Sequence, residues 1–268
     1  MWVVKEIESS AEVLEGAQYL SGLLSREIGL AGFYGNFQPA SVAGSAPPNF
    51  CQHMDREQVI KAMPFPVDGI DDVGSDYKLC GGETLLSGTD VILVRRSAIS
   101  QKSPRYKLQS QQIYIQGSFT NSNPIIDRGS NSVAFNLMQG TERKPVRAWQ
   151  QTIYYVSKDN TFKRRRFLNG KYRRSEPLVD GVHDFQVEYM LRSADKSYPC
   201  SEDYLSPPLT NQQWEQVIAV RLHFLLRSSW QGISQKSQEH KYANKTYVIP
   251  DDGHYELFKV LAPVMNKL

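Results

Sequence analysis

Apolar residues in the first thirty positions recur at the spacing of an α-helix. Eight of them divide 25 residues into seven steps, so the mean step is close to the ~3.6 residues of a helical turn. The eight positions are Val3, Ile7, Ala11, Leu14, Ala17, Leu20, Leu24 and Ile28. Gly32 and Gly35 follow, and glycines commonly end helices. We therefore predict one amphipathic helix from about Trp2 to Leu30.

The start of this helix lacks the usual signal. No Ser, Thr, Asp or Asn precedes Trp2 to cap the first turn. We expect that the sequence begins inside a longer helix. Within the 268 residues no run of about 18 apolar residues occurs, so no transmembrane span is predicted, and no signal peptide is recognisable.

After the helix the pattern changes twice. Residues 36–82 contain five prolines and several glycines and are predicted to be irregular. Residues 88–268 then alternate with a period of two, which is typical of strands. The predicted strands are 90–96, 111–116, 132–138, 148–157, 161–168, 171–175, 182–191, 217–227 and 255–261, with loops at 198–213 and 231–253.

One helix followed by many strands indicates an α+β fold with antiparallel sheet. No linker or repeat divides the chain, so residues 1–268 are predicted to form a single domain. The aromatic content, 14 Tyr, 11 Phe and 4 Trp, also favours strands over a helical bundle.

The strongest hairpin signal is Asn169-Gly170 between two strand-like runs. A two-residue turn there would place Phe167 opposite Tyr172. It would also oppose two arginine pairs, Arg166 with Arg173 and Arg165 with Arg174, which is unfavourable.

This hairpin carries much of the positive charge. Residues 158–174 hold eight Lys or Arg and one Asp, whereas the whole chain has a net charge of only +3. One interpretation is a projecting hairpin, or a sheet edge kept soluble by charge. The other is a docking patch for an acidic partner, phospholipid headgroups or DNA. The candidate patch is Lys163, Arg164, Arg165, Arg166, Lys171, Arg173 and Arg174.

The sequence offers little enzyme chemistry. The P-loop, HExxH, CxxC and GxSxG patterns are all absent, and the five histidines are scattered. Asp71, Asp72 and Asp76 lie in a glycine-rich stretch within residues 68–76, but without the residue order of an EF-hand. We interpret that stretch as a solvated loop rather than a calcium site. We therefore predict no enzyme, no cofactor and no small-molecule substrate.

A family resemblance follows from the end of the predicted helix. The segment Leu14–Phe37 (LEGAQYLSGLLSREIGLAGFYGNF) resembles the region after the membrane helix in PilW-type minor pilins of type IV pili. That family has an Ala/Leu-rich helix, an Arg, and then Ala-Gly-Phe/Tyr-x-Gly. The matching residues are Arg26, Ala31, Gly32, Phe33 and Gly35. Residues 87–98, 154–167, 177–191 and 214–229 resemble later family segments in the same order.

The resemblance implies a pilin-like fold, in which the long helix packs on antiparallel sheets. Its packing and assembly face would consist of Trp2, Val3, Val4, Ile7, Leu14, Leu20, Leu24 and Ile28. Trp2, Val3 and Val4 are expected to extend beyond the domain. The family's prepilin cleavage site and its apolar membrane helix are absent from this chain.

The resemblance also bears on the three cysteines. Many relatives carry Cys directly after the Ala-Gly-x-x-Gly motif, where this chain has Asn36. Because pilins assemble through an oxidising compartment, we favour a Cys51–Cys80 disulfide, with Cys200 unpaired. Three reduced cysteines are the alternative.

By resemblance, the protein is a non-enzymatic minor pilin. It would join other minor pilins and the major pilin in a complex that primes pilus assembly and ends at the tip. An N-terminal helix absent from this chain would anchor it in the inner membrane, with the domain in the periplasm before assembly and outside the cell afterwards. The alternatives are a type II secretion minor pseudopilin, a DNA-binding or other polyanion-binding module that uses the basic hairpin, and a periplasmic enzyme with an unfamiliar site.

Overall fold

The computed structural model describes residues 2–35, 37–40, 46–52, 54–104, 106–118, 121–193, 200–228, 238–249 and 253–267. Its first element is the predicted helix, α1 (Trp2–Gly29). Two short helices, α2 (Arg56–Ala62) and α3 (Asn211–Glu215), and three 3₁₀ segments, η1 (Leu79–Gly81), η2 (Gly129–Ala134) and η3 (Met265–Lys267), interrupt a chain made mainly of strands.

Two antiparallel sheets form the body of the molecule. The first, sheet I, has the order β1 (Val67–Ile70), β2 (Val91–Ser97), β7 (Arg147–Val156), β3 (Ile113–Ser118) and β4 (Asn121–Arg128). It also contains β8 (Phe162–Leu168), which pairs with β7, β9 (Lys171–Tyr172) and β10 (Glu176–Val179). The second, sheet II, has the order β12 (Cys200–Leu205), β11 (Val182–Arg192), β13 (Val217–Arg227) and β16 (Tyr255–Pro263).

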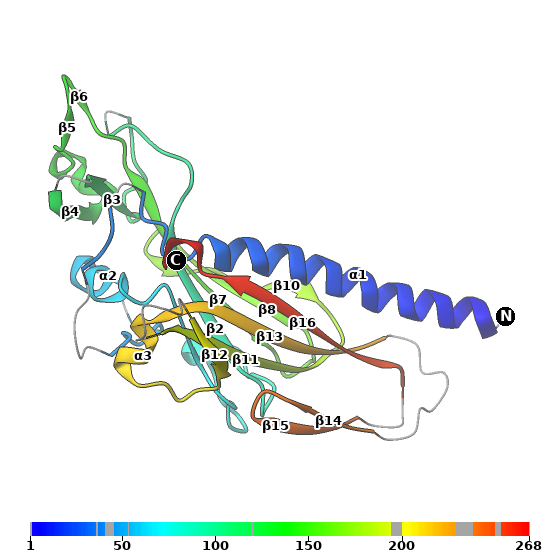
Figure 1. Ribbon diagram of the computed structural model, residues 1–268. Helices are drawn as coiled ribbons and strands as arrows, with labels where there is room; N and C mark the ends of the chain where they lie inside the picture. Colours follow the sequence, from blue (N-terminus) through cyan, green and yellow to red (C-terminus); the bar gives the residue numbers. More distant parts are fainter. Residues whose placement is uncertain are drawn as a thin grey trace.

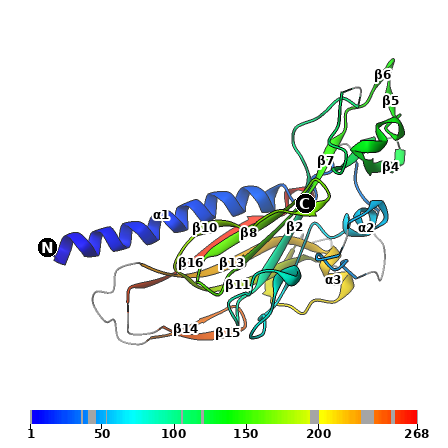
Figure 2. The same ribbon diagram turned by 180° about the vertical axis from the view of Figure 1, so that it is seen from behind.

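Two short ribbons are attached to this body. One is β5 (Met138–Gln139) with β6 (Glu142–Arg143), and the other is β14 (Gln238–Tyr242) with β15 (Lys245–Ile249). Figure 1 shows α1 lying along one side of the sheets, with its N-terminal end pointing away from the β5–β6 ribbon, and Figure 2 shows the same separation from behind. The molecule therefore has two distinct ends along the direction of α1.

The main core lies where α1 and the two sheets meet. Leu24 and Ile28 of α1, Ile92 and Val94 of β2, and Phe224 of β13 belong to one buried apolar cluster. Because the side chains of β2 alternate, Val91 and Leu93 point to the opposite face of sheet I, where a second cluster fills the space beneath the segment from Phe50 to Leu85. Sheet I is thus covered on both faces.

The buried stripe of α1 differs in part from the predicted one. Leu20, Leu24 and Ile28 are fully buried as expected, but Leu14 is 54% exposed and Val13 is buried instead. On a helix, Val13 lies in line with Leu20, seven residues on, whereas Leu14 is turned about 100° away. The prediction for Leu14 as a residue that packs on the sheet was therefore wrong.

Gly16 explains how α1 comes close to the sheets in its N-terminal half. A Cβ atom at this position would lie 3.1 Å from Cγ1 of Val179 and 3.6 Å from Cδ1 of Leu226. The absence of a side chain therefore lets the helix backbone approach β10 and β13. Gly22, by contrast, faces open space.

The α+β prediction is confirmed, with differences in detail. The predicted strand at 132–138 is wrong, because residues 129–134 form η2 and only Met138 begins a strand. The irregular region 36–82 contains α2 and β1, and the two predicted loops contain β12 and the β14–β15 ribbon. These missed elements are short and rich in polar residues, so they carry little periodic signal.

We predict opposite effects for the same substitution at the two glycines of α1. Gly16→Leu should lower the free energy of unfolding by about 1–3 kcal/mol, because the new side chain must displace Val179 and Leu226. Gly22→Leu, the matched control, should raise it by up to about 1 kcal/mol through helix propensity alone. Urea denaturation followed by circular dichroism measures both, and equal effects would contradict this packing.

Candidate assembly site

The glycine-containing motif after α1 joins the helix to sheet I. Ala31 is fully buried, the Gly32 N–H donates to the Arg95 carbonyl at 2.9 Å, and the Ser97 N–H donates to the Phe33 carbonyl at 2.7 Å. Residues 31–35 therefore run beside the last part of β2 and hold the end of α1 against this strand.

Three residues of the motif have a physical reason for their identity. Gly32 and Gly35 have φ angles of +76° and +73°, a region that favours glycine. The Tyr34 hydroxyl donates to the Met63 carbonyl at 3.0 Å, and its ring stacks on Trp149 at 5.7 Å between centroids. The motif thus turns the chain sharply and then fixes it in a third apolar cluster, which contains Tyr34 and Trp149.

Glu27 provides a further link between α1 and sheet I. Its carboxylate pairs with the Arg96 guanidinium at 3.3 Å, and both side chains are 15% exposed. Because Arg96 alternates with Arg95 on β2, the two arginines serve opposite faces of the sheet. Arg96 holds the helix, and Arg95 points toward the segment that carries the disulfide.

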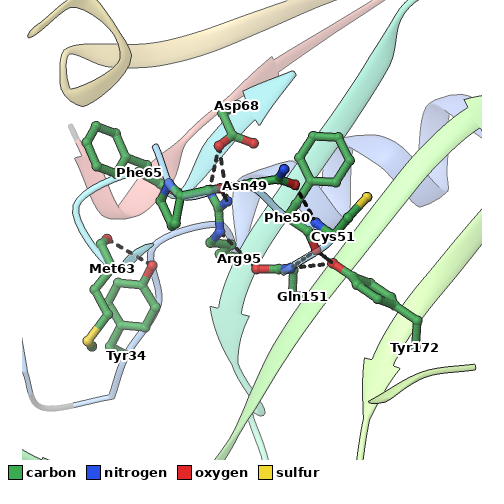
Figure 3. Close-up of polar contacts among 11 residues, drawn as sticks. Tyr34, Asn49, Phe50, Cys51, Met63, Phe65, Asp68, Arg95, Gln151 and Tyr172 are labelled. Atoms are coloured by element: carbon green, nitrogen blue, oxygen red, sulfur yellow. Dashed lines mark hydrogen bonds and ion pairs between the residues drawn. The ribbon is translucent and has the colours of Figure 1, made fainter. Parts of the chain in front are cut away.

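Arg95 is fully buried and is the centre of a polar network (Figure 3). Its Nη1 and Nη2 atoms both donate to Oδ2 of Asp68 at 3.0 Å, Nη1 donates to the Phe65 carbonyl at 2.8 Å, and Nε donates to Oε1 of Gln151 at 3.0 Å. Burial raises the pKa of Asp68, and the charge and hydrogen bonds of Arg95 oppose that rise. Through Asp68 and Gln151, Arg95 of β2 is joined to both β1 and β7.

The same network reaches the disulfide and the basic hairpin. The Tyr172 hydroxyl donates to the Phe50 carbonyl at 2.7 Å, and Gln151 hydrogen-bonds to that hydroxyl (Figure 3). Cys51, next to Phe50, is joined to Cys80 by a disulfide, the pairing favoured from the sequence. The disulfide therefore holds the segment that covers the buried guanidinium. The side chain of Cys200 lies outside the described part of the chain.

The first strand of the basic hairpin is interior to sheet I, whereas β9 and β10 on its C-terminal side pair only with β8 and form an edge of that sheet. That first strand, β8, pairs with β7, and with β9 and β10 along its length. The turn has the predicted register, with Phe167 opposite Tyr172. The Arg173 N–H donates to the Arg166 carbonyl at 2.8 Å, as this register requires. Beyond that point Glu176 faces Arg164, one residue out of the continued register.

Four of the seven predicted patch residues bind groups of the protein itself. Lys163 pairs with Glu83 at 2.6 Å and with Asp159 at 3.2 Å. Arg164 and Arg166 both pair with Glu176, at 2.9 and 2.7 Å. Arg165 donates to the Leu79 and Arg173 carbonyls and lies over the Tyr172 ring. The Glu176 carboxylate thus offsets the charge of two of the patch arginines.

The other three patch residues are exposed. The side chains of Lys171, Arg173 and Arg174 form no ion pair with any residue that the structure describes. The turn that precedes them lies beside β3, because a Cβ atom at Gly170 would be 3.0 Å from the Gln111 carbonyl oxygen and the Asn169 N–H donates to Oε1 of Gln112 at 2.7 Å. The free positive charge is therefore confined to the turn and its C-terminal side.

The Asp-rich loop is partly structured. The Asp72 and Val187 N–H groups donate to the Asp90 carboxylate at 2.9 and 2.7 Å, and burial raises the pKa of Asp90 to about 8. Lys245 of β15 pairs with Asp72 at 3.5 Å and with Asp184 at 3.6 Å. Within the described ranges, no group of three or more His, Cys, Asp or Glu has the arrangement of a metal site.

The outer face of α1 remains open. Leu14 and Tyr19 are 54% and 48% exposed, and Glu8 and Glu15 are exposed beside them. The side chains of Trp2, Val3, Val4 and Ile7 lie outside the described part, although their backbone is helical. None of the described helices is long and apolar enough to cross a bilayer.

Sequence reasoning missed the buried polar network. Arg95 stands in the run Val91–Ser97, where a charged residue beside four apolar ones could have been noticed as a candidate for a buried pair. Its partner Asp68 lies in the region expected to be irregular, and no spacing relates the two residues. A contact between two distant segments has no local signature.

The comparison with protein families agrees with the resemblance seen in the sequence. Residues 153–266 match the family described as Type IV Pilus-assembly protein W, PilW. The predicted PilW resemblance is confirmed over these residues. The PilW region begins within β7 and includes β8 to β11 and all of sheet II, so it contains the basic hairpin and the strands on which α1 packs.

We also compared the chain with solved structures and with curated proteins. A type IV-like pilin from Thermus thermophilus aligns with 94% of this chain and 96% of its own, with a TM-score of 0.44 and 11% identity. No curated protein matches this chain.

We predict that Arg95→Met is strongly destabilising. It would leave the Asp68 carboxylate buried without its counter-ion, which typically costs about 3–5 kcal/mol. Arg96→Met, the matched control on the same strand, breaks a more exposed pair and should cost about 1 kcal/mol. Urea denaturation of both variants is the measurement, and similar losses would refute a central role for Arg95.

We also predict a pH-dependent contribution from Glu176. Partial burial opposes ionisation, but hydrogen bonds from Arg166 and Arg164 outweigh it and hold the pKa of Glu176 below its usual range. A lowered carboxyl pKa contributes stability that is present at neutral pH and is lost as the pH falls through that pKa.

Glu176→Gln should therefore lower the free energy of unfolding by up to about 1 kcal/mol at pH 7. The difference from the original protein should disappear below the lowered pKa. Glu142→Gln, at an exposed position, is the control and should have little effect at either pH. A loss for Glu176→Gln that persists unchanged in acid would show that charge is not the cause.

Proposed function

We propose that this protein is a non-enzymatic minor pilin, a subunit of a complex that primes type IV pilus assembly and lies at the pilus tip. The observation that carries the proposal is the PilW match of residues 153–266. It is supported by α1, a long helix that buries one face against the sheets and leaves other side chains exposed. The proposed partners are other minor pilins and the major pilin.

The physical role of α1 follows from its two faces. Val13, Leu20, Leu24 and Ile28 bind the helix to its own sheets, so its orientation is fixed. Leu14 and Tyr19, about 140° apart around the helix and both outside the buried stripe, leave apolar surface in water, and such surfaces commonly mark contact sites. Neighbouring subunits would bury them by packing along the helix.

The position of this protein in the pilus can be tested on surface fibres sheared from cells that make it. The proposal expects this chain in the fibres, with a processed and methylated N-terminus, and immunogold label at fibre ends. Label along the whole fibre would contradict a tip position. A processed form found only in the cell envelope would favour a type II secretion pseudopilin, and no processed form would refute both.

The open face of α1 gives a sharper prediction. Leu14→Arg together with Tyr19→Arg should reduce surface piliation at least tenfold, while the melting temperature changes little because both side chains are exposed. The matched control is Val248→Arg on β15, where the side chain is 55% exposed, and piliation should stay normal. Normal piliation with both α1 substitutions would remove α1 from the assembly site.

A further inference from the structure

A small pocket of about 210 Å³ opens beside the last residues of the motif that follows α1. Pockets for drug-sized ligands usually measure ~300–1,000 Å³, so this one suits a smaller molecule. Its walls include Tyr34 and Gly35 of the motif, Ile115 of β3, and Lys144, Pro145 and Arg147 where the chain enters β7.

Two cations line this pocket without an acidic partner. None of its described lining residues is Asp or Glu, and neither Lys144 nor Arg147 forms an ion pair within the part of the chain that the structure describes. Burial lowers the pKa of Arg147, and no carboxylate offsets that effect. The pocket therefore has a positive charge that the subunit itself leaves unbalanced.

Arg147 is held so that one edge of its guanidinium stays unpaired. Nη1 donates to the Ala98 carbonyl at 3.0 Å and also to the Ile99 carbonyl, and the guanidinium carbon lies over the Phe33 ring, 5.0 Å from its centroid. No described residue accepts a hydrogen bond from Nε or Nη2. These two nitrogens form a side of the guanidinium whose N–H groups match the two oxygens of a carboxylate.

Gly35 leaves room beside this unpaired edge. A Cβ atom at position 35 would lie 2.9 Å from Nε of Arg147 and 3.0 Å from its Cδ. A side chain there would therefore take the space that borders the Nε–H group. The φ of +73° favours glycine at this position for the turn, and the same glycine keeps the edge of Arg147 uncovered.

Lys144 supplies the second charge. Its Nζ donates to Oγ of Ser118 at 2.7 Å, and because an ammonium group has three N–H donors, two remain for a ligand. Both cations are thus anchored to the protein, Lys144 at Ser118 and Arg147 at two carbonyls. A ligand would therefore find them already ordered, which lowers the entropy cost of binding.

We propose that this pocket binds the carboxylate of a small organic acid. The carboxylate would accept from Nε and Nη2 of Arg147 and from Nζ of Lys144, while Ile115 and Pro145 would contact the carbon skeleton. Figure 1 shows β3 at the end of the molecule opposite the N-terminus of α1, so subunits that pack along the N-terminal half of α1 would leave the pocket accessible. The inference adds a ligand to the proposed pilin function and does not depend on it.

Inorganic phosphate fits the pocket less well. Phosphate sites commonly use the N–H groups of a helix N-terminus or of consecutive backbone residues. None of the described helices begins at this pocket, and Ile115 and Pro145 add apolar wall that a phosphate ion would not use. The combination of a guanidinium edge with apolar side chains favours an organic acid.

Titration of the purified chain with D-glucuronate tests the site, with D-glucose as the neutral probe of the same ring. In NMR spectra of the arginine Nε–H groups, the Arg147 signal, identified by its loss in Arg147→Lys, should shift with glucuronate and not with glucose. Lys144→Gln should weaken glucuronate binding at least about threefold, and Arg147→Lys at least about tenfold, because lysine keeps the charge but lacks the planar pair of donors.

Lys107→Gln is the matched control, because it removes one positive charge from an exposed position outside the pocket, and its affinity should be unchanged. Melting temperatures show whether the variants fold, and if Arg147→Lys does not, Lys144→Gln and the Arg147 signal of the original chain still decide. No shift with glucuronate, an equal shift with glucose, or equal affinities of Lys144→Gln and Lys107→Gln overturns the proposal. Tighter binding of inorganic phosphate than of glucuronate would also overturn it. Because binding is measured in solution, its outcome is independent of where the fibre experiment finds the protein.

Discussion

The structure depends on a single buried charge pair. Arg95 and Asp68 lie in the middle of sheet I, and the guanidinium also binds the Phe65 carbonyl and Gln151. Removing a cation of this kind from water is costly unless its donors find acceptors. The neighbouring segments are arranged to supply them, so β1, β7 and the disulfide-linked segment are all positioned around one side chain. The backbone carbonyl of Arg95 also accepts a hydrogen bond from Gly32, in the motif that follows α1.

The periodic parts of the fold could be predicted because each signal was local. The 3.6-residue repeat gave α1, and alternation gave β2, β7, β8, β11 and β13 nearly to their ends. The Asn169-Gly170 dipeptide fixed the turn because its backbone preferences belong to those two residues. Leu14 and Val13 could not be separated in the same way, since both are apolar and only the position of the sheets decides which of them is buried.

The candidate site was less accessible to sequence reasoning, since its contacts are long-range. The seven cations of the hairpin look alike in the sequence, yet Arg164 and Arg166 share Glu176, and Lys163 binds Glu83 from a segment 80 residues away. Which cations are paired depends on where the fold brings Glu83 and Glu176. Charge counting therefore located the basic region but overstated the part that is available to a partner.

The way in which α1 lies along the sheets has a mechanical consequence. Its contacts with β16 and β13 run lengthwise, and its far end is tied through Glu27 and residues 31–35 to β2. A pull on the start of α1 along its axis would load these contacts in shear, many at once, rather than peel them apart one by one. A helix held in this way would transmit tension into β2, the strand that carries Arg95.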